Sequence, residues 1–261
     1  MPRLTDREQI RAILETDRPW AAYAIADLEP GFFECAHWFC AANDEPSLAL
    51  CYAGFGTPVI ITVGRAEALQ SVLHETITAM KPHELYAAVK PEVLPLLTQY
   101  FHVVETRHMQ RMVFDPSRYR PLPTSDVVAL GPDDLEALRR LYADGQTSGE
   151  APDWFLPEML VQETYFGARE GNQLVAAAGT HVTTLSEGVS GLGNIYTRRD
   201  RRGLGLSTRV THAVVAKLLP MELATIVLNV RDSNTAAIRV YERIGFQNYC
   251  RYIEAPLVRR G

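Results

Sequence analysis

Apolar and polar positions alternate with two different periods along the chain, and the switches between them predict an α/β protein. A capping box of Thr5 and Glu8 predicts a helix at the start of the chain. Apolar residues then recur at helical spacing over 66–80, and a second such stretch covers 91–100. Runs of strand-forming residues predict strands at 32–40, 47–53, 58–63, 84–89 and 106–114.

The second half of the chain repeats this order of elements after a proline-rich stretch at 115–126, which predicts a linker. Helices are expected at 132–142, 155–161, 206–219 and 234–244. Strands are expected at 127–130, 164–169, 173–184, 189–197, 223–230 and 246–253.

Equivalent elements of the two halves lie at a nearly constant offset. The strand that ends at Val63 matches the strand that ends at Thr197, and the helix that begins at Ala66 matches the one that begins at Leu206. This repeat of pattern, with little residue identity, predicts two tandem α/β domains with mixed sheets, over residues 1–120 and 121–261.

Composition excludes several classes of protein. The 26 basic and 31 acidic residues give a net charge of −5, which argues against a general nucleic-acid binder. No apolar run reaches the length of a membrane span, and the charged N-terminus does not resemble a signal peptide, so a cytoplasmic protein without membrane contact is expected. Cysteines and histidines lack metal-ligand spacing, which favours free thiols over a disulfide and predicts no metal site. The four cysteines are Cys35, Cys40, Cys51 and Cys250.

A glycine-rich loop joins a predicted strand to a helix only in the second half. Its residues Arg202, Gly203, Leu204, Gly205, Leu206 and Ser207 stand where backbone N–H groups of a helix N-terminus would face an anion. Five arginines against Asp200 give the stretch 198–209 a local charge of +4, which indicates a small polyphosphate as ligand. The alternative is a glycine turn beside solvated arginines. The loop matches neither a Walker A nor a Rossmann motif.

A second motif lies on the helix at 234–244. Asn234, Ala237 and Tyr241 would share one helical face, and Gly245 would end the helix. A polar amide and a phenol two turns apart suggest a lined crevice, although a buried structural tyrosine would give the same pattern.

Together the two motifs resemble the acetyl-CoA-binding core of the GNAT acyltransferase superfamily, in particular the glycine N-acyltransferase-like branch. The resemblance is carried by Gly203 and Gly205 of the loop and by the pattern NxxAxxxYxxxGF, which Asn234 begins and Phe246 ends. It covers 194–252 closely and 126–258 loosely. It implies a catalytic second domain and a degenerate first domain without the phosphate loop.

The resemblance implies a role for each motif. The backbone of Ile195, Tyr196 and Thr197 would pair with the pantetheine arm, the amides of Arg202 to Ser207 would hold the pyrophosphate, and Asn234 would bind nearby. Tyr241 would protonate the leaving thiolate, which suits a phenol because its pKa lies near 10.

The sequence departs from the family in two places. Asp200 occupies a phosphate-loop position where a carboxylate should repel an anion, and Gly191 and Leu192 stand where many members carry an acidic base on the strand. His181, Glu163 and Glu187 are the candidate bases. The alternatives to a side-chain base are a chain of water molecules and an amine that is already neutral when it binds. Trp154 and Phe155 follow a polar loop where this fold shapes its acceptor site.

The sequence therefore predicts an N-acetyltransferase that moves an acyl group from acetyl-CoA, or another acyl-CoA, to a primary amine of a small molecule by direct attack in a ternary complex. The alternatives are a non-catalytic acyl-CoA sensor and a scaffold protein. The sequence leaves open the acceptor, the acyl chain and the oligomeric state.

Overall fold

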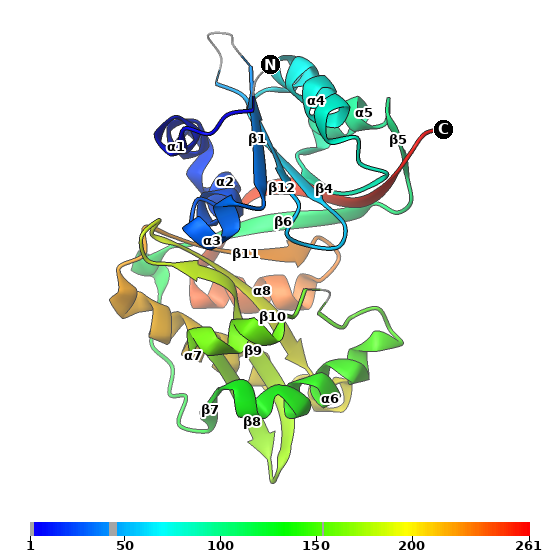
Figure 1. Ribbon diagram of the computed structural model, residues 1–261. Helices are drawn as coiled ribbons and strands as arrows, with labels where there is room; N and C mark the ends of the chain where they lie inside the picture. The colour runs from blue at the N-terminus through cyan, green and yellow to red at the C-terminus, as the bar shows by residue number, and fades with distance from the viewer. Residues whose placement is uncertain (1–2, 42–45, 153) are drawn as a thin grey trace. The chain divides into compact units, whose positions relative to one another are not determined.

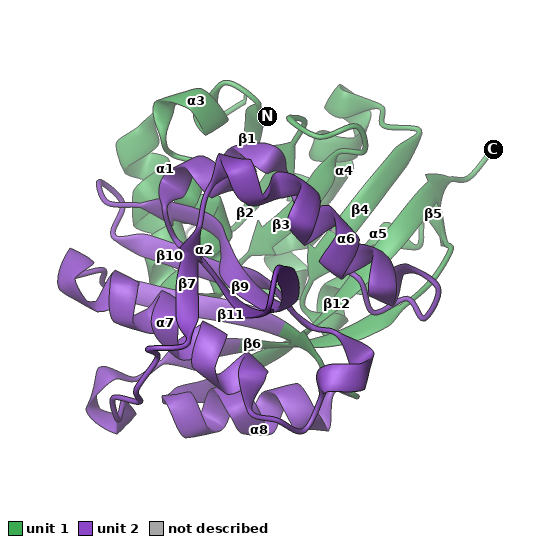
Figure 2. Ribbon diagram, turned by 90° about the horizontal axis from the view of Figure 1, so that it is seen from below, with its two compact units in different colours: residues 1–111, 230–233, 248–261 green, residues 112–229, 234–247 purple. Residues whose placement is uncertain are grey.

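The computed structural model describes residues 3–41, 46–152 and 154–261, which fold into two compact units (Figure 1). The first unit comprises residues 1–111, 230–233 and 248–261, and the second comprises residues 112–229 and 234–247 (Figure 2). The two units thus interleave along the chain. The domain boundary between residues 120 and 121, which the sequence repeat suggests, stays a prediction.

The first unit is built on a mixed sheet in the order β1-β2-β3-β4-β12, with β5 paired to β12. Strands β3 and β4 are parallel, and the other pairs are antiparallel. Its strands are β1 (Ala36–Cys40), β2 (Leu48–Tyr52), β3 (Val59–Val63), β4 (Glu84–Val89), β5 (Phe101–Val103) and β12 (Phe246–Arg259), the last of which starts in the second unit. Its helices are α1 (Arg7–Leu14), α2 (Arg18–Ala26), α3 (Pro30–Phe33), α4 (Ala66–Met80) and α5 (Leu94–Leu97).

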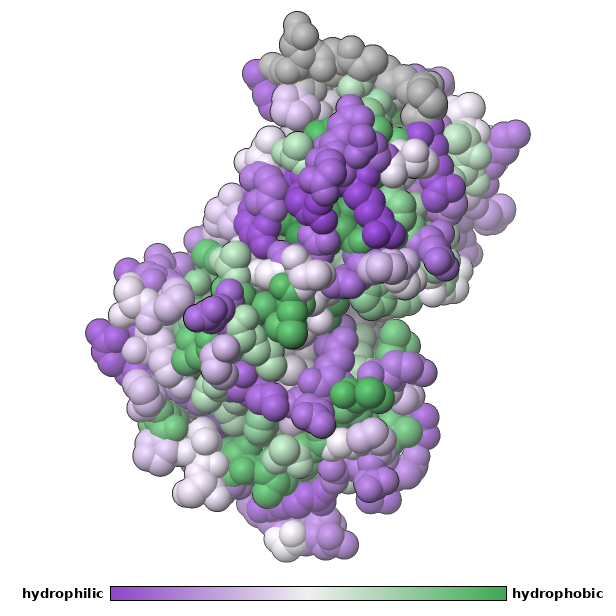
Figure 3. All heavy atoms as spheres, turned by 60° about the vertical axis from the view of Figure 1, so that its left-hand side comes forward, coloured by the Kyte–Doolittle hydropathy of each residue, from purple (hydrophilic) through white to green (hydrophobic). Residues whose placement is uncertain are grey.

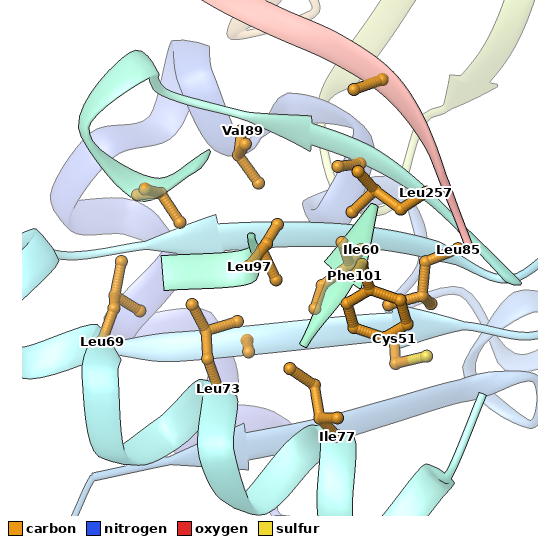
Figure 4. Close-up of a cluster of buried hydrophobic side chains, with 14 of the residues drawn as sticks. Cys51, Ile60, Leu69, Leu73, Ile77, Leu85, Val89, Leu97, Phe101 and Leu257 are labelled. Carbon is orange, nitrogen blue, oxygen red and sulfur yellow. The ribbon is translucent and has the colours of Figure 1, made fainter. Parts of the chain in front are cut away.

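Helix α4 and the sheet enclose the core of the first unit (Figure 4). Leu69, Leu73 and Ile77 lie on one face of α4 because they follow one another at intervals of four residues, and that face packs against sheet residues that include Ile60 and Leu257. The C-terminal strand β12 therefore completes the core of a unit that begins at the N-terminus.

The second unit repeats the plan with the strand order β7-β8-β9-β10-β11. Strands β10 and β11 are parallel, and β7 to β10 pair antiparallel. These strands are β7 (Val127–Leu130), β8 (Tyr165–Glu170), β9 (Gln173–Thr184), β10 (Val189–Thr197) and β11 (Thr225–Arg231). The helices are α6 (Leu135–Gln146), α7 (Leu206–Leu218) and α8 (Thr235–Ile244), and strand β6 (Arg107–Phe114) ends in this unit.

Most predicted elements are present, and the differences have local causes. Helix α1 is capped by Asp6 and not by Thr5, because the Asp6 carboxylate accepts hydrogen bonds from the amides of Glu8 and Gln9. The predicted strand at 32–40 starts as the short helix α3, since Pro30 favours a first helical turn. The sheet partners of β12 extend that strand to Arg259.

Ten large apolar residues are exposed in the described part of the chain, and Val104, Val161 and Leu185 are the most exposed of them. On the face shown in Figure 3, apolar side chains form small areas separated by polar ones. Within the described residues, no helix combines the length and the apolar character that crossing a membrane requires. The four cysteines are free thiols, and the described residues contain no group of ligands suited to a metal ion.

Candidate functional site

The site begins where two parallel strands of the second unit stop pairing. Strands β10 and β11 pair from Val189 with Thr225 to Leu192 with Leu228, although both strands continue further. At the same point the pairing of β10 with β9 shifts, between Gly193 and Tyr196. Asn194 lies inside this bulge with a φ of 53°, a left-handed conformation that is rare for a residue other than glycine.

Several hydrogen bonds stabilise the bulge and hold Asn194 in its strained conformation. The Tyr142 hydroxyl donates to the Asn194 carbonyl at 2.9 Å, and the Asn194 amide donates to the Tyr165 hydroxyl at 2.7 Å and to the Trp154 carbonyl at 3.2 Å. Asn194 itself is buried. Strain that surrounding contacts fix so firmly is typical of functional sites.

After the bulge, β10 pairs with β9 again through Tyr196 and Thr197. The Tyr196 hydroxyl donates to Asp144 at 2.8 Å, and burial together with that carboxylate raises the pKa of Tyr196 to about 12. The pairing of β10 with β11 ends before 195–197, and on this stretch the Thr197 carbonyl accepts a hydrogen bond from Arg202 Nε at 3.4 Å.

The glycine loop leads from β10 into an N-terminus of α7 that no side chain caps. Gly203 and Gly205 have φ angles of 79° and 73°, which other residues adopt only with strain, and Gly205 is the N-cap residue. A Cβ atom at Gly203 would meet no atom within 4 Å, so the loop faces open space. The first amides of α7, including those of Leu206 and Ser207, thus offer the anion-binding arrangement that the sequence predicts.

The arginines around this loop are ion-paired, contrary to the surplus of positive charge that the sequence suggests. Carboxylates that are distant in sequence approach them, so the local charge of +4 is offset in space. The pairs are Arg199 with Asp144, Arg201 with Glu170, Arg202 with Glu150 and Arg209 with Asp126, at 2.7–3.4 Å. An anion at this loop would therefore meet backbone amides more than free guanidinium groups.

Asp200 does not face the loop as an isolated negative charge. Its carboxylate pairs with Arg198 at 2.6 Å and with Arg201 at 2.9 Å. A hydrogen bond from Arg198 is the main reason that the pKa of Asp200 lies below its usual value. The sequence departure at this position is thereby neutralised.

Asn234 and Tyr241 lie two turns apart on α8. Asn234 is exposed and caps the helix, because its side-chain oxygen accepts from the Ala237 amide at 3.1 Å. Tyr241 is buried against Phe246, with ring centroids 6.3 Å apart, and its hydroxyl makes no hydrogen bond within the described residues. Burial raises the pKa of Tyr241, so the phenol is protonated at neutral pH.

The three candidate bases occupy different surroundings. Glu163 is exposed and lies 3.9 Å from Lys217 of α7. Glu187 lies in the turn between β9 and β10, about 23 Å along the strand from Asn194 at roughly 3.3 Å per residue. His181 lies at the register shift of β9, and burial, partly opposed by the side chain of Asn194, lowers the pKa of His181 to about 4.

Trp154 and Phe155 lie close to the bulge. The Trp154 carbonyl binds the Asn194 side chain, and the Phe155 ring packs against Tyr142 and Tyr165 at 5.2 and 6.0 Å. Their contact with an acceptor stays a prediction.

Two residues of the site, Asn194 and Asp144, were not among the candidates predicted from sequence. Asp144 carries no motif of its own, because its partners Tyr196 and Arg199 lie on other elements. Glycines at 191 and 193 just before a buried asparagine are the signal of a bulge that could have pointed to Asn194.

Comparisons with known proteins agree with this geometry. The FR47-like protein family model matches residues 165–253. A mycothiol acetyltransferase from Thermobispora bispora is 34% identical over 221 residues, which are 80% of this chain and 61% of that protein. The chain thus spans less than two thirds of the length of the curated relatives it matches.

Solved structures extend the likeness to both units. A GNAT-family protein from Novosphingobium aromaticivorans matches with a TM-score of 0.63 and 17% identity over 94% of this chain and 100% of its own. A tandem GNAT protein from the clavulanic acid biosynthesis pathway matches with a TM-score of 0.58 and 12% identity over 99% of this chain and 98% of its own. These likenesses show a tandem GNAT fold, and the second unit carries the match to the FR47-like family model.

Proposed function

We propose that this protein is an N-acetyltransferase that transfers the acetyl group of acetyl-CoA to a primary amine. The observation that carries the proposal is the end of β10–β11 pairing at a bulge, directly before a glycine loop and an uncapped helix N-terminus. The 34% identity to a mycothiol acetyltransferase over 80% of the chain supports the reaction class.

The second unit offers acetyl-CoA three kinds of contact. Backbone groups of Ile195 to Thr197 would pair with the pantetheine arm, as a further strand would. Amides of Arg202 to Ser207 would bind the pyrophosphate at the positive end of the α7 dipole. The amide nitrogen of Asn234, which makes no hydrogen bond within the described residues, would donate to the same ligand.

Tyr241 would supply the proton that the CoA thiolate takes up as it leaves. Its raised pKa keeps that proton on the phenol at neutral pH until a strong base forms next to it. Direct attack of the amine in a ternary complex requires no covalent enzyme intermediate. The acceptor proposed is a small-molecule amine, and an amine related to mycothiol is a first choice because the curated relatives are mycothiol acetyltransferases.

A panel of amines with thiol release as readout tests this function. The panel would contain an amine related to mycothiol, amino acids, aminosugars, polyamines, an aminoglycoside antibiotic and a short peptide with a free N-terminus. At least one member should release CoA at a rate well above that of acetyl-CoA hydrolysis, with acetylated amine as product. Binding of acetyl-CoA with no transfer to any amine would favour the sensor, an alternative that the missing acid at Gly191 and Leu192 keeps open.

A further inference from the structure

Two glycines, Gly179 of β9 and Gly193 of β10, pair beside the bulge, and the rings of Tyr165 and His181 pack against them. A Cβ atom at Gly179 would collide with the Tyr165 ring, and one at Gly193 would collide with the imidazole of His181. The imidazole therefore fills the space that a side chain from β10 would otherwise enter.

This position coincides with the gap in the family pattern. The strand acid that the resemblance leads one to expect falls at Gly191 or Leu192, within two residues of Gly193. An imidazole from the neighbouring strand thus stands where β10 itself provides no basic group. We infer from this geometry that His181 is the general base for the amine acceptor, an inference that rests on the proposed acetyl transfer.

The surroundings of His181 suit that role. Asn194, whose own position is fixed by Tyr165 and Tyr142, interacts with the imidazole electrostatically, and its side-chain oxygen is buried without a hydrogen-bond partner within the described residues. The residue is half-buried. Burial lowers the pKa of His181 to about 4, which keeps the imidazole neutral at physiological pH, so a ring nitrogen has a lone pair for the proton.

Two residues of the second unit, His181 and Tyr241, account for both proton transfers of the reaction. The neutral amine attacks the thioester carbonyl, a C–N bond forms, and His181 takes one proton from the attacking nitrogen. The C–S bond then breaks with its electron pair on sulfur, and Tyr241 donates a proton to the thiolate. Transfer of one proton from the imidazolium to the phenolate through solvent restores both groups.

The test compares His181→Ala, His181→Gln and Gly193→Ala with a control, His102→Ala, which alters an exposed histidine of β5 in the first unit. Acetyl transfer to the best acceptor of the panel is measured together with acetyl-CoA affinity by calorimetry. We expect kcat to fall about 100-fold or more in both His181 variants, with the Kd of acetyl-CoA within twofold of wild type. Added imidazole should restore part of the activity of His181→Ala in proportion to its concentration, because the deleted ring leaves room for a base.

Gly193→Ala keeps the histidine but pushes the imidazole aside, so it should lose kcat without rescue by imidazole. His102→Ala should behave as wild type. Wild-type rates in His181→Gln, or a defect in His181→Ala that imidazole does not relieve, would overturn the assignment of His181 while leaving the proposed function intact. A wild-type chain that acetylates no amine would instead overturn the proposed function, and the inference with it.

Discussion

At the scale of single residues, the candidate site contains some residues that can be predicted from sequence motifs and others that cannot. Gly203, Gly205 and Tyr241 are visible as motifs because both signals are local, glycines directly before one helix and a fixed spacing along another. Asn194 and Asp144 are not visible, since their importance comes from partners about 50 residues away, such as Tyr142 and Arg199. Pairings of that kind depend on tertiary structure, which local pattern does not encode.

The phenol of Tyr241 provides a test at this scale. Tyr241→Phe removes only the hydroxyl, which has no hydrogen-bond partner within the described residues, so the fold should be unaffected. We expect kcat to fall by about 10² while the KM for acetyl-CoA changes little, because the proton is needed only as the thiolate leaves. Steady-state kinetics decide the point, and an unchanged kcat would refute the role of general acid.

The lowered pKa of His181 also predicts a dependence of stability on pH. An unfolded histidine takes up a proton near pH 6.5, whereas the folded one does so only near pH 4. As pH falls through this window the unfolded state gains protons first, so the free energy of unfolding drops, by about 2 kcal/mol at pH 5. Urea unfolding at pH 7 and pH 5 measures the drop, which should be smaller in His181→Gln. Part of the drop should remain, because burial also lowers the pKa of His212.

At the scale of elements, the two units share the same order of strands and helices but differ where a strand leads into the following helix, after β3 in the first unit and after β10 in the second. In the first unit the Trp20 indole donates to the Thr62 carbonyl of β3 at 2.7 Å, and Trp20 is buried under Arg111. Thr62 corresponds to Tyr196, since the matched strands end at Val63 and Thr197. A side chain of the protein thus occupies the strand position that corresponds to the one proposed to bind pantetheine in the second unit.

This difference predicts one acetyl-CoA per chain. Gly64, which follows β3, is packed against Ser47 so closely that a Cβ atom would lie 2.8 Å from the Ser47 Cβ, and this leaves little room for a ligand there. Isothermal titration should give a stoichiometry of one, and Gly205→Ala in the second unit should weaken that single event because alanine is strained at a φ of 73°. Two equivalents bound per chain would show that the first unit also has a working site.

Helices with a long apolar periodicity lie where the sequence predicts them, whereas a predicted helix that a proline or a turn interrupts is shorter than expected. Helix α4 is present at its predicted residues because Leu69, Leu73 and Ile77 bury a full face. The predicted helix over 91–100 is reduced to a 3-10 turn and α5, because Pro95 and the start of β5 at Phe101 interrupt it.

At the scale of the whole molecule, the alternation of helices and strands predicted the fold class, and the repeat predicted the tandem architecture. The interleaving of the two units could not be predicted in this way. Strand β12 pairs with β4 through Ile253 to Val258, yet no periodicity indicates which sheet a C-terminal strand joins.

A fragment of residues 1–120 should therefore fold poorly, although the sequence repeat suggests a domain there. It would lack β12, so β4 would lose its hydrogen-bonded neighbour and the core would lose Ile253 and Leu257. Burial of those two side chains contributes about 3–6 kcal/mol, a large share of the stability of an ordinary domain. Circular dichroism and hydrogen exchange should show loss of structure in the fragment, and restoration by a fragment that contains residues 248–261 would support the role of β12. A stable, cooperatively unfolding 1–120 fragment would contradict it.

The position of β12 also sets an order of events during synthesis on the ribosome. Tyr86 of β4 and Glu254 of β12 are hydrogen-bonded at 2.8 Å but are 168 positions apart in the chain. The sheet of the first unit therefore stays open at β4 until the last strand has left the exit tunnel, while the strands of the second unit emerge earlier than that closing strand. The first unit is thus completed only after the strands of the second unit have been made, and the open edge of β4 is where a chaperone would be needed most.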